Sequence, residues 1–195
     1  MLFAGDTRTE KAAQLLVGQD VAHARATPAV RGPLAFILPR HHRALLYDLL
    51  TLERVKVPLA GHSKDEVLRE LVQLAMPSAD AAARDRTVQA VLDREALLST
   101  GIGVGIAIPH GRTSDVDDII LTAGLAPDPI DFDALDGRPV SLFFLLLGPE
   151  RAAGAHVRAL GRISRILRHE SVRDGLNASS SAEEFMELLV GAEAP

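Results

Sequence analysis

The sequence predicts a single α/β domain in which a mixed β-sheet is flanked by helices on both faces, forming a three-layer sandwich. Two continuous apolar runs, Ile119 to Leu125 and Val140 to Leu147, are typical of strands that are buried on both faces. Segments with helical apolar periodicity lie before and after these runs. Because 47% of the 195 residues are hydrophobic, the chain can build one sizeable core.

Local signals define the individual elements. Ser63 with Glu66 and Ser181 with Glu184 form capping boxes, and Asp80 is a further N-cap candidate, so helices are predicted to begin at all three places. In chain order the expected elements are a helix at 44–50, a strand at 55–57, two helices between Ser63 and Arg94, strands at 106–108, 119–125 and 140–147, and helices at 152–169 and after Ser181.

The first part of the chain differs from the rest. Residues 1–43 carry several prolines and no long periodic segment, so they are predicted to be an N-terminal extension of unknown role, attached to a domain at 44–192. His41 and His42 could be read as a metal pair. An exposed basic patch is the better interpretation, because neighbouring side chains on a regular element point apart.

Composition excludes several classes of function. Without cysteine, the chain can form no disulfide, thiolate zinc site or cysteine nucleophile. The net charge of −5 gives no nucleic-acid footprint. The sequence shows neither a secretory signal nor an apolar run long enough to span a bilayer, so no direct membrane insertion is expected and the predicted location is the cytoplasm.

The stretch from Arg94 to Arg112 is the strongest candidate for a functional site. It joins the end of a helix to a glycine-rich loop at Gly101–Gly105, a short strand and His110. Backbone that can approach a ligand, one aimed imidazole and nearby guanidinium groups suit an anion or a phosphoryl group. His156, in the first turn of a later helix, is expected near free backbone N–H groups that also favour an anion.

Phosphoryl transfer to an imidazole needs few parts. The accepting nitrogen must be neutral and correctly aimed, which a hydrogen bond to the other ring nitrogen secures. Positive groups and N–H donors must stabilise the charge on the oxygens during transfer. Arg94, Arg112, the glycine loop and His156 are candidates for these parts around His110. From the residues alone, a structural histidine at a strand end is the alternative.

Other polar clusters have simpler interpretations. The acidic residues at 128–136 do not have the spacing or the terminal glutamate of an EF-hand calcium loop, so a polar turn is predicted. A histidine-based metal hydrolase lacks a clustered ligand set. A row of arginines on the helix at 152–169 fits either a solvated face or a docking surface for an acidic partner: Arg158, Arg162, Arg165 and Arg168.

The segment STGIGVGIAIPHG resembles the phosphorylation-site motif of the fructose/mannitol-type IIA domain of the bacterial phosphoenolpyruvate:sugar phosphotransferase system, a family that includes nitrogen-regulatory IIA proteins. The resemblance extends over about residues 44–190, and the ordered set of segments is far more specific than IPHG alone. The further segments that resemble the family are SKDEVLRELVQLA, VLDREALLSTGIG, IDFDALDGRPVSLFFLLLGP and AHVRALGRISRIL.

The resemblance implies a phosphotransferase with a phosphohistidine intermediate. His110 would accept a phosphoryl group on Nε2 from the phosphohistidine of HPr or its nitrogen-branch counterpart, and pass it to a cysteine of a IIB component. His156 would assist the transfer, Arg94 would supply positive charge, and no cofactor or metal is implied. Since this sequence has no cysteine, IIB would be a separate polypeptide. In the alternative, regulatory role, the phosphorylation state of His110 would control binding to target proteins.

Overall fold

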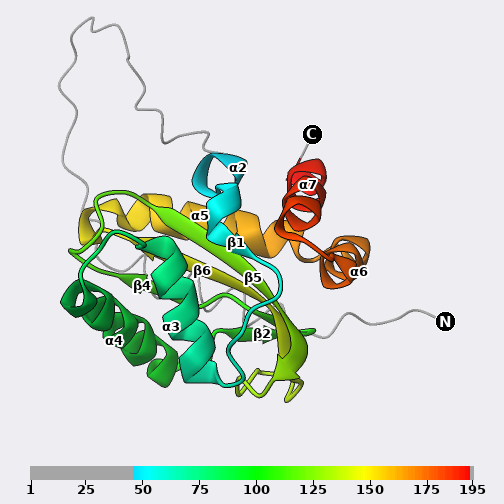
Figure 1. Cartoon of the computed structure of the whole chain (residues 1–195), viewed down its shortest axis with the longest axis horizontal. Coiled ribbons are helices and arrows are strands. Elements are labelled where there is room, and N and C mark those ends of the chain that lie inside the picture. Colours follow the sequence, from blue (N-terminus) through cyan, green and yellow to red (C-terminus); the bar gives the residue numbers. More distant parts are fainter. Residues whose placement is uncertain (1–45, 194–195) are drawn as a thin grey trace, which may run out of the picture.

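The computed structural model describes residues 46–193, whose arrangement is shown in Figure 1. The predicted N-terminal extension at 1–43, with His41 and His42, lies outside the described residues. The division between this extension and the domain at 44–192 therefore stays a prediction.

The observed elements follow the predicted order, and the predicted caps are formed: the side chains of Ser63 and Asp80 accept hydrogen bonds from backbone N–H groups of α3 and α4. Along the chain the elements are α2 (Leu46–Leu49), the 3₁₀ helix η2 (Leu52–Arg54), β1 (Val55–Lys56), α3 (Lys64–Ala75), α4 (Ala81–Leu97), β2 (Gly101–Gly103), β3 (Ile106–Ala107), β4 (His110–Arg112), β5 (Ile120–Ile130), β6 (Val140–Gly148), the 3₁₀ helix η3 (Glu150–Ala152), α5 (Ala153–Ile166), α6 (Glu170–Ala178) and α7 (Ala182–Glu193).

Three local predictions are wrong. The helix predicted at 152–169 ends at Ile166, and α6 follows as a separate helix. The first part of the predicted glycine loop is β2, which pairs with β3. The strand predicted to end at Leu125 continues to Ile130, and its pairing with β6 is irregular between these two residues. That irregularity accommodates two prolines that a regular ladder would not tolerate.

One mixed six-stranded sheet forms the middle layer. Its strand order is β1-β5-β6-β3-β2, with β4 also paired to β6. Both β3 and β4 run parallel to β6, with Ile106 opposite Leu142 and His110 opposite Leu146. Because the register is unchanged, β3 and β4 are two halves of one strand that is interrupted at Ile108 and Pro109.

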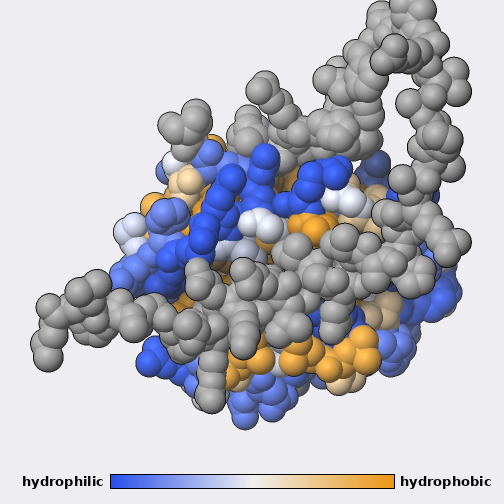
Figure 2. All heavy atoms as spheres, turned by 180° about the vertical axis from the view of Figure 1, so that it is seen from behind, coloured by the Kyte–Doolittle hydropathy of each residue, from blue (hydrophilic) through white to orange (hydrophobic). Residues whose placement is uncertain are grey.

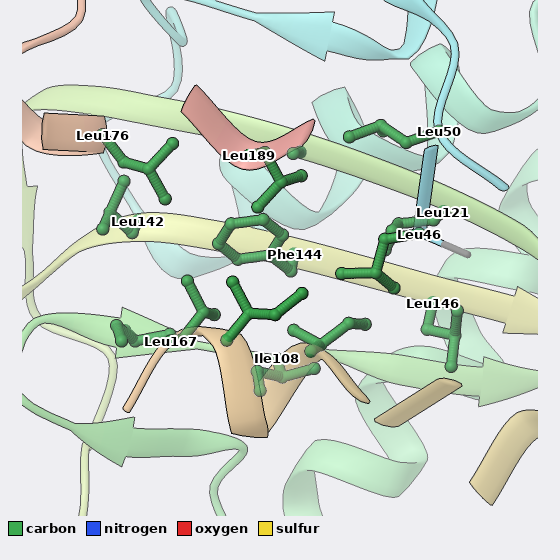
Figure 3. Close-up of a cluster of buried hydrophobic side chains, with 14 of the residues drawn as sticks. Leu46, Leu50, Ile108, Leu121, Leu142, Phe144, Leu146, Leu167, Leu176 and Leu189 are labelled. Atoms are coloured by element: carbon green, nitrogen blue, oxygen red, sulfur yellow. The ribbon is translucent and has the colours of Figure 1, made fainter. Parts of the chain in front are cut away.

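Alternating side chains of β6 divide the core between the two faces of the sheet. Leu142, Phe144 and Leu146 belong to one buried cluster with residues of α2, α5 and α7, part of which is shown in Figure 3. Phe143 and Leu145 belong to a second cluster with residues of α3 and α4, which lie in front of the sheet in Figure 1. The predicted three-layer sandwich is confirmed.

The arginine row on α5 is only partly a solvated face. Arg158 and Arg165 of α5 are exposed, as is Arg168 just after the helix, whereas Arg162 is half-buried and lies 3.5 Å from the Glu193 carboxylate of α7. Seen from the side opposite to Figure 1, the surface of the described residues is a mixture of hydrophilic and hydrophobic areas (Figure 2). Within residues 46–193, no helix is long and apolar enough to cross a membrane.

Candidate active site

His110 lies at an edge of the sheet, between helices that cover opposite faces. Pro109 interrupts the strand, and the chain then resumes pairing with β6 as β4. Side-chain alternation puts His110 on the face of Ile106 and Ile108, which is the face covered by α5. The following residue, Gly111, faces α4, where an added Cβ would lie 3.0 Å from a methyl carbon of Val91. The small residue lets α4 pack closely against β4.

Both ring nitrogens of His110 are hydrogen-bonded, and their partners determine the tautomer. Nε2 lies 3.1 Å from Nε of Arg94, and Nδ1 lies 2.9 Å from the carbonyl oxygen of Ile108. A guanidinium group only donates, so Nε2 accepts and carries the lone pair. A carbonyl only accepts, so the proton of the neutral ring is on Nδ1. The nitrogen with the lone pair is therefore directed towards α4.

Arg94 is held at the end of α4 by a second hydrogen bond. Its Nη1 donates to the carbonyl oxygen of Leu98 at 2.9 Å, while its Nε donates to His110. Since Leu98 follows the last residue of α4, the guanidinium is also near the negative end of the helix dipole. The predicted pairing of Arg94 with His110 is thus present in the geometry of the site.

His156 is brought to the same place by α5. It lies in the first turn of this helix, and its ring centroid is 5.7 Å from that of His110. The side chain is almost fully buried, and neither ring nitrogen has a hydrogen-bond partner. Gly148 at the end of β6 leaves room for the ring, because an added Cβ would lie 3.1 Å from its Nδ1. An unpartnered buried imidazole is costly, so the two ring nitrogens are available to hydrogen-bond a ligand group.

Electrostatics keep His156 uncharged. Burial lowers the pKa of His156, and electrostatic interactions with His110 and Arg112 lower it further, to about 3. At neutral pH the ring therefore offers one N–H donor and one acceptor nitrogen. A neutral donor beside two cationic side chains, Arg94 and Arg112, is suited to an anionic group that all of them surround.

The low pKa of His156 predicts a specific pH dependence of stability. Unfolding restores the ordinary value of 6.5, so between pH 6.5 and about 3 the unfolded chain binds more protons at this residue. The free energy of unfolding should then decrease as the pH falls through this window, by up to about 1.4 kcal/mol per pH unit. Urea denaturation of the wild type and of His156→Gln at pH 7 and pH 5 measures this, since the variant lacks the titration. Identical pH dependence of the two proteins would contradict the low pKa.

The three predicted site residues line one open pocket. Its volume is about 690 Å³, and it extends from α4 across β4 to the start of α5. Arg112, predicted as a further positive group, is also in the wall, whereas the predicted glycine loop is not. The lining residues are Ala90, Asp93, Arg94, Leu97, His110, Gly111, Arg112, Glu150 and His156.

Two glycines that the sequence did not identify as site residues are needed here. Gly111 admits α4, and Gly148 admits His156. The position of Gly148 directly after the longest apolar run, and just before the helix of His156, was a usable signal. In contrast, no group of three side chains suited to hold a metal ion occurs within residues 46–193.

Known proteins are similar to this chain in sequence and in fold. The family model described as phosphoenolpyruvate-dependent sugar phosphotransferase system, EIIA 2, matches residues 48–191. The chain belongs to this family. The match spans the elements from α2 to α7, so it includes all residues of the EIIA pocket. Membership in the EIIA 2 family implies phosphoryl transfer as the class of chemistry.

Relatives of this EIIA chain carry two kinds of names. The nitrogen regulatory protein of Bradyrhizobium diazoefficiens is 38% identical over 143 residues, which are 73% of this chain and 92% of that protein. The PTS system fructose-specific EIIABC component of Bacillus subtilis is 33% identical over 142 residues, again 73% of this chain but only 22% of that protein. Among solved structures, the nitrogen regulatory protein IIA-Ntr of Neisseria meningitidis is 35% identical with a TM-score of 0.67, covering 73% of this chain and 97% of that one.

Proposed function

We propose that this protein is a phosphocarrier whose His110 accepts a phosphoryl group from the phosphohistidine of an HPr-type protein. The observation that carries the proposal is the state of the His110 ring. Its Nδ1 is hydrogen-bonded to the Ile108 carbonyl, and its Nε2 lone pair faces the pocket beside Arg94. A neutral, oriented imidazole among positive groups is what a phosphoryl acceptor requires.

The transfer forms one P–N bond and breaks another, so it needs no further reactant. The Nε2 lone pair of His110 attacks phosphorus and forms the new P–N bond. The P–N bond to the donor histidine breaks, and its electron pair returns to the donor ring. Arg94 occupies Nε2 beforehand, so its guanidinium must leave the nitrogen and is then placed to bind a phosphoryl oxygen.

His156 would serve the phosphorylated state. Its two ring nitrogens are buried without hydrogen-bond partners. A phosphoryl group on Nε2 of His110 would supply an acceptor for its N–H, and its negative charge would oppose the effect of Arg112 on the His156 pKa. His156 is therefore proposed to hold the phosphoryl group and to stabilise it during transfer.

The next acceptor lies outside these 195 residues. We propose that the phosphoryl group passes from His110 to a cysteine of a IIB component, and this sequence contains no cysteine. One solved structure of similar fold is a complex of enzyme IIA and phosphorylated enzyme IIB for mannitol from Escherichia coli. We propose that the protein acts in the cytoplasm, the location that the sequence predicts.

A regulatory role is the second candidate. It is favoured by the relative named nitrogen regulatory protein, of which the match covers 92%. In this role the same phosphorylation of His110 would change the binding of a target protein at the pocket. The two roles share one site and differ in the partner of the phosphorylated protein. In transport the partner is a IIB component, and in regulation it is a target protein.

The decisive experiment is a phosphorelay. The chain is incubated with HPr, the enzyme that phosphorylates the HPr histidine from phosphoenolpyruvate, and radiolabelled phosphoenolpyruvate. One acid-labile, alkali-stable phosphate should be attached to the chain, because a P–N bond hydrolyses in acid. An unlabelled chain would overturn the phosphocarrier proposal. Addition of purified IIB separates the two roles: rapid loss of label from this protein supports transport, and retention of label supports regulation.

Replacing His156 by Ala should slow the second transfer. The variant is expected to become labelled, because the Nε2 nucleophile is intact, but to pass the group to IIB about a hundredfold to a thousandfold more slowly, as when one hydrogen-bond donor to transferring oxygens is removed. Quench-flow measurement of label loss gives the rate. Equal rates for wild type and variant would remove His156 from the mechanism.

A further inference from the structure

A buried carboxylate next to the pocket has no role in the steps above. Glu95 follows Arg94 on α4, but its side chain is buried, with 4% exposed. One carboxylate oxygen accepts from Ser99 Oγ at 3.0 Å and lies 2.8 Å from Lys64 Nζ of α3. The other accepts from the backbone N–H of Thr100 at 2.8 Å and from its hydroxyl group. Glu95 therefore joins α3, α4 and the segment that leads into β2.

The network around Glu95 is charged and almost fully satisfied. Burial lowers the pKa of Lys64, but the hydrogen bonds and charges of Glu95 and Asp133 outweigh burial, so the pKa of Lys64 is raised. Lys64 also donates to the carbonyl oxygen of Phe132 at 3.0 Å. Removing one member of such a group leaves the others buried without partners, so its geometry is well defined.

Thr100 connects this network to His110 through two successive hydrogen bonds. The carbonyl oxygen of Thr100 accepts from the backbone N–H of Ile108 at 2.9 Å. The carbonyl oxygen of Ile108 accepts from Nδ1 of His110 at 2.9 Å. Ile108 lies between β3 and β4, where the strand is interrupted, and has no ladder partner on β6. The bond to Thr100 thus helps to fix the carbonyl that orients the histidine.

We propose that Glu95, held by Lys64, is a positioning residue for His110: through Thr100 and Ile108 it keeps the His110 proton on Nδ1 and the lone pair on Nε2. The inference rests on the proposed function for its significance. The tautomer itself is a property of the unphosphorylated protein and can be measured without any transfer.

The test compares Glu95→Ala and Glu95→Gln with a matched control, Glu70→Ala. Glu70 of α3 is also a partly buried carboxylate that accepts from two backbone N–H groups, those of Ala60 and Gly61, and pairs with Lys56. Its partners lead to β1 and the loop after it, not to His110. The readouts are the ¹⁵N chemical shifts of the His110 ring, which report the tautomer, and the rate of phosphorylation at saturating HPr.

Glu95→Ala should move the ring resonances towards a mixture of tautomers and lower the phosphorylation rate about tenfold, with the half-saturating HPr concentration unchanged. Glu95→Gln retains an acceptor for Thr100 and should show a smaller change. Glu70→Ala should alter neither readout, although it loses thermal stability.

Unchanged ring shifts in the folded Glu95 variants would overturn the inference, as would an equal loss of rate in Glu70→Ala. If Glu95→Ala does not fold, the milder Glu95→Gln decides the question by the same shifts. A shifted tautomer in these variants together with an unlabelled wild type would uphold the positioning role and overturn the phosphocarrier proposal. The two failures are therefore distinguishable.

Discussion

Replacing His110 by Ala is expected to abolish phosphorylation of the protein entirely. The proposed bond to phosphorus forms at Nε2 of this residue, which carries the lone pair because Arg94 donates to it. His156 cannot substitute, since its ring is buried on α5 and its centroid is 5.7 Å away. Incubation with HPr, the enzyme that phosphorylates the HPr histidine, and radiolabelled phosphoenolpyruvate should leave this variant unlabelled, whereas the wild type takes up one phosphate.

Two further variants test whether the absence of label in His110→Ala results from unfolding of the protein. His110→Asn is a smaller change that keeps polar atoms near the Ile108 carbonyl, and it should also remain unlabelled in a folded protein. His62→Ala, at an exposed position just before α3, should be labelled like the wild type. Stoichiometric label on folded His110→Asn would show that another residue accepts the phosphoryl group.

The fold was predictable because its strongest signals are local. The apolar runs of β5 and β6 and the caps of α3 and α4 each depend on residues close together in the chain. The separation of α5 from α6 was missed, because Leu167 continues the apolar spacing of α5 and no proline or glycine marks the break. The strand character of β2 was missed since glycines alone favour a loop, and only its pairing with β3 makes it a strand.

The meeting of His110 and His156 follows from strand register, which the sequence does not display. Arg112 at the end of β4 lies opposite Gly148 at the end of β6. From there η3 leads directly into α5, so the first turn of α5 returns beside β4. Both histidines could be identified as candidate site residues from their local sequence context and from the resemblance to the IIA family. Their distance, the tautomer of His110 and the network of Glu95 depend on contacts between distant segments.

Replacing Arg94 by Ala should lower the rate of phosphorylation about a hundredfold to a thousandfold, as for loss of one donor to a charge that develops during transfer. Two effects oppose each other. Removal of the guanidinium frees Nε2 of His110, to which Arg94 donates at 3.1 Å. It also removes the positive group placed to bind a phosphoryl oxygen. The second effect should win, because the freed hydrogen bond is replaced by water, whereas nothing replaces the charge in the closed interface with the donor.

Comparison of Arg94→Lys with Arg94→Ala shows which property of the side chain is needed. Lysine retains the charge, but its single nitrogen cannot contact His110 and the Leu98 carbonyl in the fork geometry of Nε and Nη1. It should therefore recover only part of the rate. Arg86→Ala, on the same helix but paired with Asp115, is the matched control and should phosphorylate like the wild type. A wild-type rate in Arg94→Ala would mean that Arg94 only covers the nucleophile, and that Arg112 supplies the charge for transfer.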